Sequence, residues 1–231
     1  MRRAAGLVFA LLAALATAPA LAQPQEQNVI VTTGTAELRF PPDRAVIVLG
    51  MEVQKSGAAE AMASAAHTGG LVLNALRKVG IPREALQTSG ISLAPVYARV
   101  GGIETIVGYR AAYTVTAVVD DLDLVGKALD GAVTAGANRV HGISFTLRNP
   151  AEARKKALAD AAQEARAKAT AIAEALGLRI KRIVRIIEQS AEVLPSRSTF
   201  PGMMQATPAV QTPIEPGQVT VTARVTAVFE Y

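Results

Sequence analysis

The strongest constraint on the fold is the order in which two hydrophobic periods follow each other along the chain. Residues 106–119 alternate apolar with small or polar side chains, which predicts a strand with one buried face. Residues 44–54 are apolar on both faces, as expected for a central strand. The complete predicted order is strand, helix, strand, strand, helix, strand, at residues 44–54, 57–79, 87–99, 106–119, 121–136 and 139–147.

This order predicts a ferredoxin-like core, in which both helices pack on one face of the sheet. A strand at 28–40 precedes the core, and a helix at 149–176 with strands at 179–189 and 219–231 follows it. We therefore expect an α+β fold in which these outer elements extend the core. Pro95 cannot donate to a sheet ladder, so its strand should lie at an edge or contain a bulge.

Two helices have recognisable signals in the sequence. Ser56 and Asp121 precede the first two helices of the core and are predicted to cap them. The buried stripe of the first helix is predicted to comprise Met62, Ala65, Ala66, Val72, Leu76 and Val79.

The helix at 149–176 begins with Asn149 and Pro150, a cap followed by a first-turn proline. Its alanines recur at every fourth residue, at Ala153, Ala157, Ala161, Ala165 and Ala169. Side chains this small allow a close approach to a sheet or to another helix.

Residues 190–216 differ in kind from the rest of the chain. They hold five of the 12 prolines and follow neither the helical nor the strand period. We predict a long irregular insertion between two strands that pair with each other. The insertion is either a hairpin tip without fixed structure or an arm that becomes ordered on a neighbouring subunit.

The N-terminus has the layout of a secretory signal peptide. Arg2 and Arg3 precede an apolar run at 6–18, and Ala20 and Ala22 occupy the small-residue positions before a cleavage site. The run is shorter than the roughly 20 residues that span a bilayer. We predict cleavage after Ala22 and a single mature domain at 23–231 that has no transmembrane segment and folds outside the cytoplasm.

Composition excludes several kinds of chemistry. The chain has no Cys, so it cannot form a disulfide, a thiol nucleophile or a cysteine metal site. Its net charge of +5 falls by two, to +3, without Arg2 and Arg3. A balance this mild, together with export and the absence of Trp, argues against a nucleic-acid partner.

The candidate catalytic and metal-binding residues are few. His67 lies in the first helix, and His141 lies in a strand in file with Ile143 and Phe145, without metal-ligand or triad spacing. The carboxylates Asp120, Asp121 and Asp123 lack the pattern of a calcium loop, and helix capping explains the last two.

Other motifs are weaker still. Thr88-Ser89-Gly90 lacks a nucleophile elbow, and Gly101-Gly102 opens no helix that could bind phosphate. Met203-Met204 is more simply an apolar contact than a soft-metal site. We therefore assign no catalytic, cofactor-binding or metal-binding residue and predict no cofactor.

A basic cluster surrounds the strand at 179–189, comprising Arg179, Lys181, Arg182 and Arg185. These side chains could bind an anionic lipid or phosphate. They could equally protect the edge of a sheet against aggregation.

Several segments in a fixed order resemble the SIMPL-domain family over about Val29 to Tyr231. They are Gly80-Ile81-Pro82, Gln87-Thr88, Leu93-Ala94-Pro95-Val96-Tyr97, Gly108-Tyr109-Arg110-Ala111, Val115 to Val119 with Asp121-Leu122, the helix with Ala161, Ala165, Lys168-Ala169 and Leu176-Gly177, and the strand Val225 to Tyr231. The resemblance implies a periplasmic or surface-associated protein with immunogenic and stress-defence relatives, some of them ring-like or channel-like homo-oligomers. It implies no catalytic residues.

Three functions fit these observations. The first is a non-enzymatic periplasmic protein that self-assembles and protects against envelope or oxidative stress. The second is a monomeric module that binds an anionic ligand, a lipid or an envelope protein. The third is a hydrolase with an unrecognised site.

Overall fold

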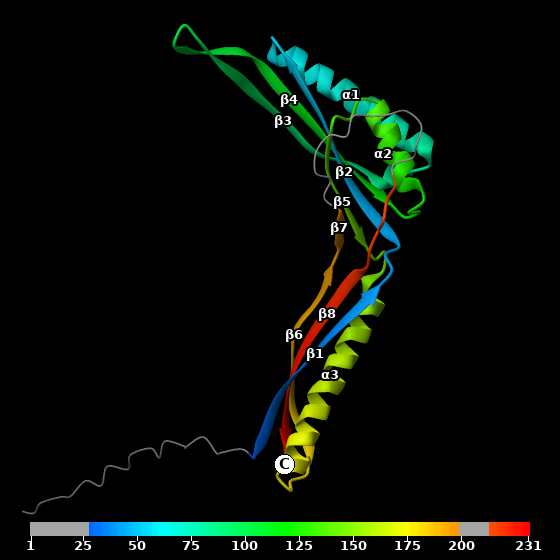
Figure 1. Ribbon diagram of the computed structural model, residues 1–231, viewed down its shortest axis with the longest axis vertical. Coiled ribbons are helices and arrows are strands. Elements are labelled where there is room, and N and C mark those ends of the chain that lie inside the picture. Colours follow the sequence, from blue (N-terminus) through cyan, green and yellow to red (C-terminus); the bar gives the residue numbers. More distant parts are fainter. Residues whose placement is uncertain (1–27, 199–212) are drawn as a thin grey trace, which may run out of the picture.

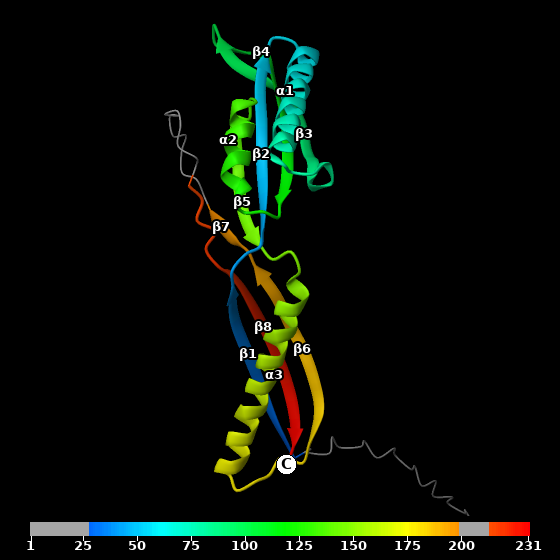
Figure 2. The ribbon, with the colours of Figure 1, turned by 90° about the vertical axis from the view of Figure 1, so that its right-hand side faces the viewer.

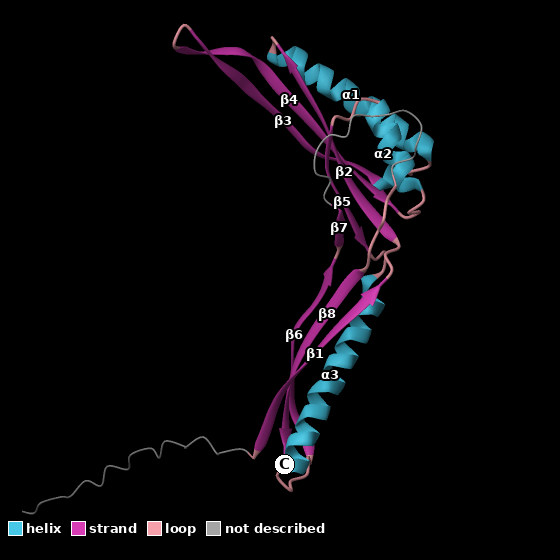
Figure 3. Cartoon of the chain, viewed as in Figure 1, coloured by secondary structure: helices cyan, strands magenta, loops and turns pink. Residues whose placement is uncertain are grey.

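The computed structural model describes residues 28–198 and 213–231. These residues form an α+β fold with two antiparallel sheets, each covered by helices on one face (Figure 3). The two sheets lie in separate lobes of a long, curved molecule, joined at a narrow waist (Figure 1). We call them the α1–α2 lobe and the α3 lobe.

The α1–α2 lobe contains the elements at 44–146 and one short later strand. In chain order its elements are β2 (Arg44–Lys55), α1 (Ala58–Val79), a 3-10 turn (Arg83–Ala85), β3 (Leu86–Val100), β4 (Ile103–Val119), α2 (Leu124–Thr134), β5 (Arg139–Thr146) and β7 (Ser196–Ser198). The sheet order is β3-β4-β2-β5-β7. The predicted central position of β2 is confirmed, because β4 and β5 pair on either side of it.

Large aliphatic side chains fill the α1–α2 lobe. Ile47, Leu49 and Met51 on β2 are fully buried beneath the helices. On α1, Val72 and Leu76 face them, while Ala66 is exposed and Met62 is only half-buried, so the predicted stripe was wrong at its start. Ala65 is buried as predicted, and Ala61 and Gly69, which were not predicted, complete the stripe.

The α3 lobe contains the two ends of the described chain. Its elements are β1 (Val29–Phe40), α3 (Pro150–Ala175), β6 (Arg182–Leu194) and β8 (Val219–Glu230), with sheet order β1-β8-β6. These elements form a sheet of their own, so the prediction that they extend the core sheet was wrong. The physical reason lies at 41–43, where two prolines end β1 and the chain turns before β2 begins.

The alanine row on α3 brings this helix unusually close to the sheet. Six alanines from Ala153 to Ala173 are buried on one face of α3. A Cβ placed on Gly34 of β1 would lie 1.9 Å from the main-chain oxygen of Ala161, so glycine is required there. The predicted close approach of this helix is thereby explained by small residues on both partners.

Polar groups attach α3 to β1 in particular. The Thr32 hydroxyl donates to the main-chain oxygen of Ala165 at 2.6 Å. The Glu164 carboxylate accepts from the main-chain N–H of Thr35, and Lys168 Nζ donates to the main-chain oxygen of Thr33 at 3.0 Å. The last two bonds use main-chain groups of Thr33 and Thr35 on the outward edge of β1, which are therefore not free to pair with a further strand.

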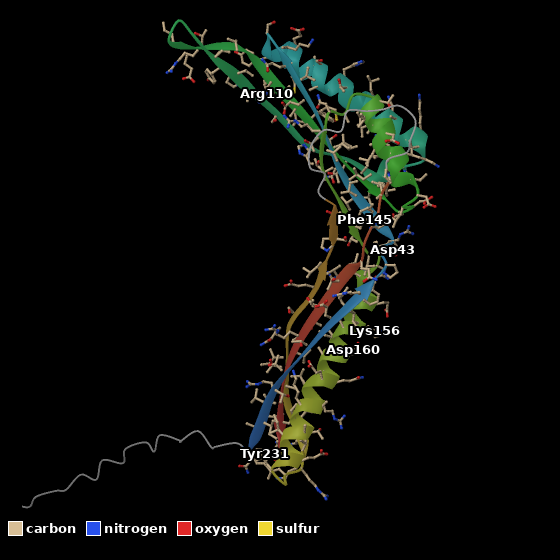
Figure 4. The ribbon with its side chains drawn as sticks, in the orientation of Figure 1. Asp43, Arg110, Phe145, Lys156, Asp160 and Tyr231 are labelled. Atoms are coloured by element: carbon tan, nitrogen blue, oxygen red, sulfur yellow. The ribbon has the colours of Figure 1, made fainter. Side chains whose placement is uncertain are left out.

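The waist is held by a small cluster of charged groups. Asp43, labelled at the waist in Figure 4, accepts from the main-chain N–H of Arg148 at 2.6 Å. Asp120 forms ion pairs with Arg44 at 2.7 Å and with Arg148 at 3.2 Å. The hydrogen bond from Arg44 lowers the pKa of Asp120 below its ordinary value of 3.8.

The predicted insertion begins later than its proline content indicates. Residues 190–194 complete β6, and Ser196–Ser198 form β7 against β5, so the predicted start of the insertion was wrong. The predicted pairing of the strands on either side is confirmed, since β6 and β8 are neighbours. Residues 199–212 of the insertion, and the predicted signal peptide and its cleavage site, lie outside the described residues.

Helix starts follow the sequence in part. The Asn149 side chain accepts from the N–H of Ala151 at 3.2 Å, which confirms this cap. The other two predicted caps were wrong, because Gly57 rather than Ser56 is the N-cap of α1 and Asp123 rather than Asp121 is that of α2. The Asp121 side chain instead accepts from the N–H of Asp123, one residue before α2 begins. Within the described chain, none of the helices has the length and hydropathy needed to cross a membrane.

Candidate functional site: an exposed apolar arm

Exposed apolar side chains gather at the hairpin that joins β3 and β4. Pairing of β2 with β4 ends at Lys55 and Tyr109, so residues 96–108 continue as a hairpin with no third strand. We call this hairpin the arm; it projects away from α1 at one end of the molecule (Figure 1).

Glycines at both ends of the arm define its shape. Gly101 and Gly102 have φ of 61° and 87°, the left-handed conformation of a two-residue hairpin turn. At the base, a Cβ on Gly108 would lie 2.7 Å from the main-chain oxygen of Lys55, so the arm leaves the sheet through a close backbone contact. A register shift between Val96 and Tyr97 adds a bulge there.

The arm exposes aliphatic and aromatic side chains. Ile103 is 71% exposed and Tyr97 is 54% exposed. Ile106 and Val107 are exposed too, as are Ile91 and Leu93 along the neighbouring edge of β3. Exposed apolar side chains that gather in one part of a molecule are characteristic of interaction surfaces.

The position of β3 confirms what Pro95 predicted. β3 lies at the edge of its sheet, and it also contains a bulge at Ser89, which has no partner between the pairs of Thr88 and Gly90. Helix α1 covers β4 and β2, and β3 receives little cover from it. Polar bonds nevertheless fix the start of β3, because Thr88 contacts the Tyr113 hydroxyl at 2.7 Å and Ser89 accepts from Thr116 at 2.9 Å.

The two histidines do not come together. His67 is exposed on α1. His141 lies against Gly50 of β2, where an added Cβ would be 2.6 Å from its Nε2. Gly50 faces away from the helices because its neighbour Leu49 faces toward them. The predicted alignment of His141 with Ile143 was wrong, since a register shift beside Gly142 leaves His141 unpaired with β2 and exposed.

The other candidate residues are also separated. Asp120 belongs to the waist, whereas Asp121 contacts the main chain before α2. In the part of the chain that the structure describes, no three His, Asp or Glu side chains gather as a potential metal site. Met203 and Met204 lie outside the described residues.

The basic cluster is divided between two faces of the α3 lobe. Arg179, Lys181 and Arg182 line a hollow of about 780 Å³ between α3 and β6. Arg185 pairs with Val228, whose side chain points away from α3, and so lies on the other face. The sequence indicated the charges but could not indicate the hollow, which α3 creates.

The comparisons agree with the SIMPL resemblance. Residues 30–229 match the family described as SIMPL, protein of unknown function (DUF541). The chain belongs to this family. It is similar to the 26 kDa periplasmic immunogenic protein of Brucella melitensis, with 34% identity over 228 residues that cover 92% of this chain and 90% of the relative. It is also similar to the uncharacterized protein YggE of Escherichia coli K12, with 30% identity over 152 residues that cover 64% and 62% of the two chains.

Proposed function

We propose that this SIMPL protein acts in the periplasm without catalysis, by assembling with further copies of itself. The observation that carries the proposal is the arm, which exposes Tyr97, Ile103, Ile106 and Val107 on a hairpin without a third strand. Burying such side chains contributes about 25 cal/mol for each Å² removed from water. A second copy of the chain is the partner that is always present at the site of export.

Periplasmic location is supported by the N-terminal pattern and by a relative. Residues 1–22 have the layout of a signal peptide with cleavage after Ala22. The Brucella relative, which aligns over 90% of its length, is itself named as periplasmic. Within this proposal the mature protein starts at Gln23 in the periplasm of a Gram-negative bacterium.

The structure of the sheet edges supports contact through side chains of the arm. Glu164 and Lys168 occupy the outward edge of β1. β6 contains two register shifts, and bulges of this kind oppose the addition of another strand. The arm of one copy would contact the next copy, and repetition of this contact around a rotation axis would close a ring.

The proposed fold of the α1–α2 lobe is ferredoxin-like. Its elements follow the order strand, helix, strand, strand, helix, strand, and its four main strands have the order β3-β4-β2-β5. This arrangement supports the ferredoxin-like interpretation of residues 44–146, with β7 and the α3 lobe as additions.

Light scattering after size exclusion tests the assembly. We expect the chain from Gln23 onward to have a mass several times that of one chain, and I103T/V107T to shift toward the monomer. The matched control is L71T/V133T, which alters two exposed aliphatic residues on α1 and α2 of the same lobe. A monomeric wild-type chain at high concentration, or an arm variant with unchanged mass, would contradict the proposal.

A protective role under envelope or oxidative stress belongs to the same proposal. In a strain that lacks the gene, we expect the wild-type chain to restore survival in peroxide, and I103T/V107T to restore less. The variant H67A/H141A should restore survival fully if no histidine chemistry is involved. Loss of protection in H67A/H141A with an unchanged mass would contradict the non-catalytic function.

A second candidate function is a module that binds an anionic ligand. The observation that favours it is the hollow between α3 and β6, which three residues of the basic cluster line.

A further inference from the structure

The hollow between α3 and β6 exists because α3 is displaced toward the opposite edge of its sheet. The bonds from Thr32, Glu164 and Lys168 attach the helix to β1, and the alanine row packs on β1 and β8. β6 receives little cover from α3. Figure 2 shows the far end of α3 diverging from the start of β6, with residues 176–181 connecting the two.

One wall of the hollow is apolar. Phe229 of β8 is 2% exposed and lines the hollow together with Ile183 of β6. Ile183 and Ile186 pair with Phe229 and Ala227, so both point to the helix-covered side of the sheet. Their side chains are 48% and 58% exposed, so the apolar surface continues along β6 from Ile183, which lines the hollow, to Ile186, which lies beyond the lining residues.

The rim of the hollow is basic. Arg166 from α3 and Arg179, Lys181 and Arg182 line it, with Glu174 as the acidic lining residue. Arg182 pairs with Glu230 at 2.7 Å, and Lys181 donates to the main-chain oxygen of Tyr231 at 3.0 Å. Among the described residues, Arg166 and Arg179 have no ion-pair partner.

We propose that this hollow binds a single-chain anionic amphiphile. The ligand's carboxylate or other anionic head contacts Arg166 and Arg179, and its hydrocarbon chain lies along Ile183 and Ile186. The volume of the hollow, about 780 Å³, lies within the range of about 300–1,000 Å³ that is usual for small-molecule sites. Charge complementarity selects the head group, because guanidinium groups pair with carboxylates through charge-assisted hydrogen bonds.

An extended peptide is less compatible with the same surface. A peptide would bind by adding a strand to β6, whose ladder is interrupted between Ile183 and Arg185 and again between Glu188 and Ser190. The exposed isoleucines and the unpaired arginines are side-chain features, which suit a ligand bound within the hollow.

The probe is dodecanoate, titrated by calorimetry into the full mature chain below its micelle concentration. We expect saturable binding that weakens with salt. The variant R166Q/R179Q should reduce affinity at least about tenfold, because it removes the charge-assisted hydrogen bonds to the anionic head. I183S/I186S should also weaken binding, through loss of contact with the hydrocarbon.

The matched control is R154Q/R185Q, which removes two arginines outside the lining of the hollow and should leave affinity unchanged. Equal affinity for dodecanol would show that charge is not recognised and would overturn the proposal. Binding only to vesicles of phosphatidylglycerol, with none to dodecanoate, would overturn it in favour of a membrane surface. Binding should persist in I103T/V107T, so the assembly proposal can fail without affecting this one.

Discussion

In the α1–α2 lobe, large aliphatic side chains such as Ile47 and Leu49 fill the space between sheet and helices. In the α3 lobe that space is narrow at β1, because Gly34 and the alanine row bring the backbones of β1 and α3 together. The first arrangement derives its stability from buried side-chain volume. The second depends on close approach and on bonds such as that from Thr32 to Ala165. Large-to-small substitutions should therefore destabilise the α1–α2 lobe more, and small-to-large substitutions should destabilise the α3 lobe more.

The largest effect is expected from G34V. The new Cβ would overlap the main-chain oxygen of Ala161, so β1 and α3 must separate, and we expect a loss of at least about 3 kcal/mol in the free energy of unfolding. Urea denaturation followed by circular dichroism measures it.

The matched control is G70V on α1, where an added Cβ meets nothing within 4 Å. We expect a change of less than about 0.5 kcal/mol for this variant. If both variants were equally stable, the close approach in the α3 lobe would not be a source of stability.

Truncation should have its larger effect in the other lobe. L49A removes a fully buried side chain from β2 and should cost about 3 kcal/mol through lost burial and a cavity. A161G in α3 removes one methyl group and should cost about 1 kcal/mol, mainly through helix propensity. If urea denaturation gave L49A and A161G equal losses in the free energy of unfolding, the proposed difference in how the two lobes are stabilised would be contradicted.

A smaller effect is expected from T32V. This change keeps the shape of a buried side chain and removes the hydrogen bond to Ala165, so a loss of about 1 kcal/mol is expected. T33V is the control, since the Thr33 hydroxyl contacts Thr226 on the face of the sheet away from α3. Thermal unfolding should rank T32V below T33V in stability.

The smallest effect is expected at the waist between the lobes. D120N removes the ion pairs with Arg44 and Arg148, and for such exposed groups we expect a loss of no more than about 1 kcal/mol at neutral pH. Because the pKa of Asp120 is lowered in the folded state, its contribution is present above the ordinary pKa and disappears as pH falls through the lowered one. In urea denaturation, D120N should therefore be less stable than the wild-type chain at neutral pH and equally stable in acid.

Several details of the structure could be derived from single residues. Pro95 indicated an edge strand, because proline lacks the N–H that a central ladder needs. The alternation in 106–119 and the two apolar faces of 44–54 indicated β4 and β2. The alanine row indicated the close approach of α3. The start of the insertion was misplaced, because residues 190–194 have no strand period of their own and become strand by pairing with β8.

The candidate site depended on features that local sequence does not contain. Val107 looked like an ordinary strand residue and Ile103 lay outside the predicted strands. Only the end of β2 at Lys55 leaves both without a covering element. His141 appeared to share a face with Ile143, but the shift in β5 moved it into solvent. Arg166 is absent from the predicted basic cluster, because only the packing of α3 brings it near Arg179.

By itself, the sequence determined the class of the fold, the order of its elements and membership of the SIMPL family, because these follow from hydrophobic period, turn residues and motif order. Only the tertiary structure decided that the outer elements form a second sheet, that β3 and β6 lie uncovered at the edges, and that a basic hollow opens beside α3. The physical reason is that a strand's neighbours are chosen by contacts between distant residues. The contact between Gly34 and Ala161 is an example, because nothing in the local sequence around either residue indicates the other.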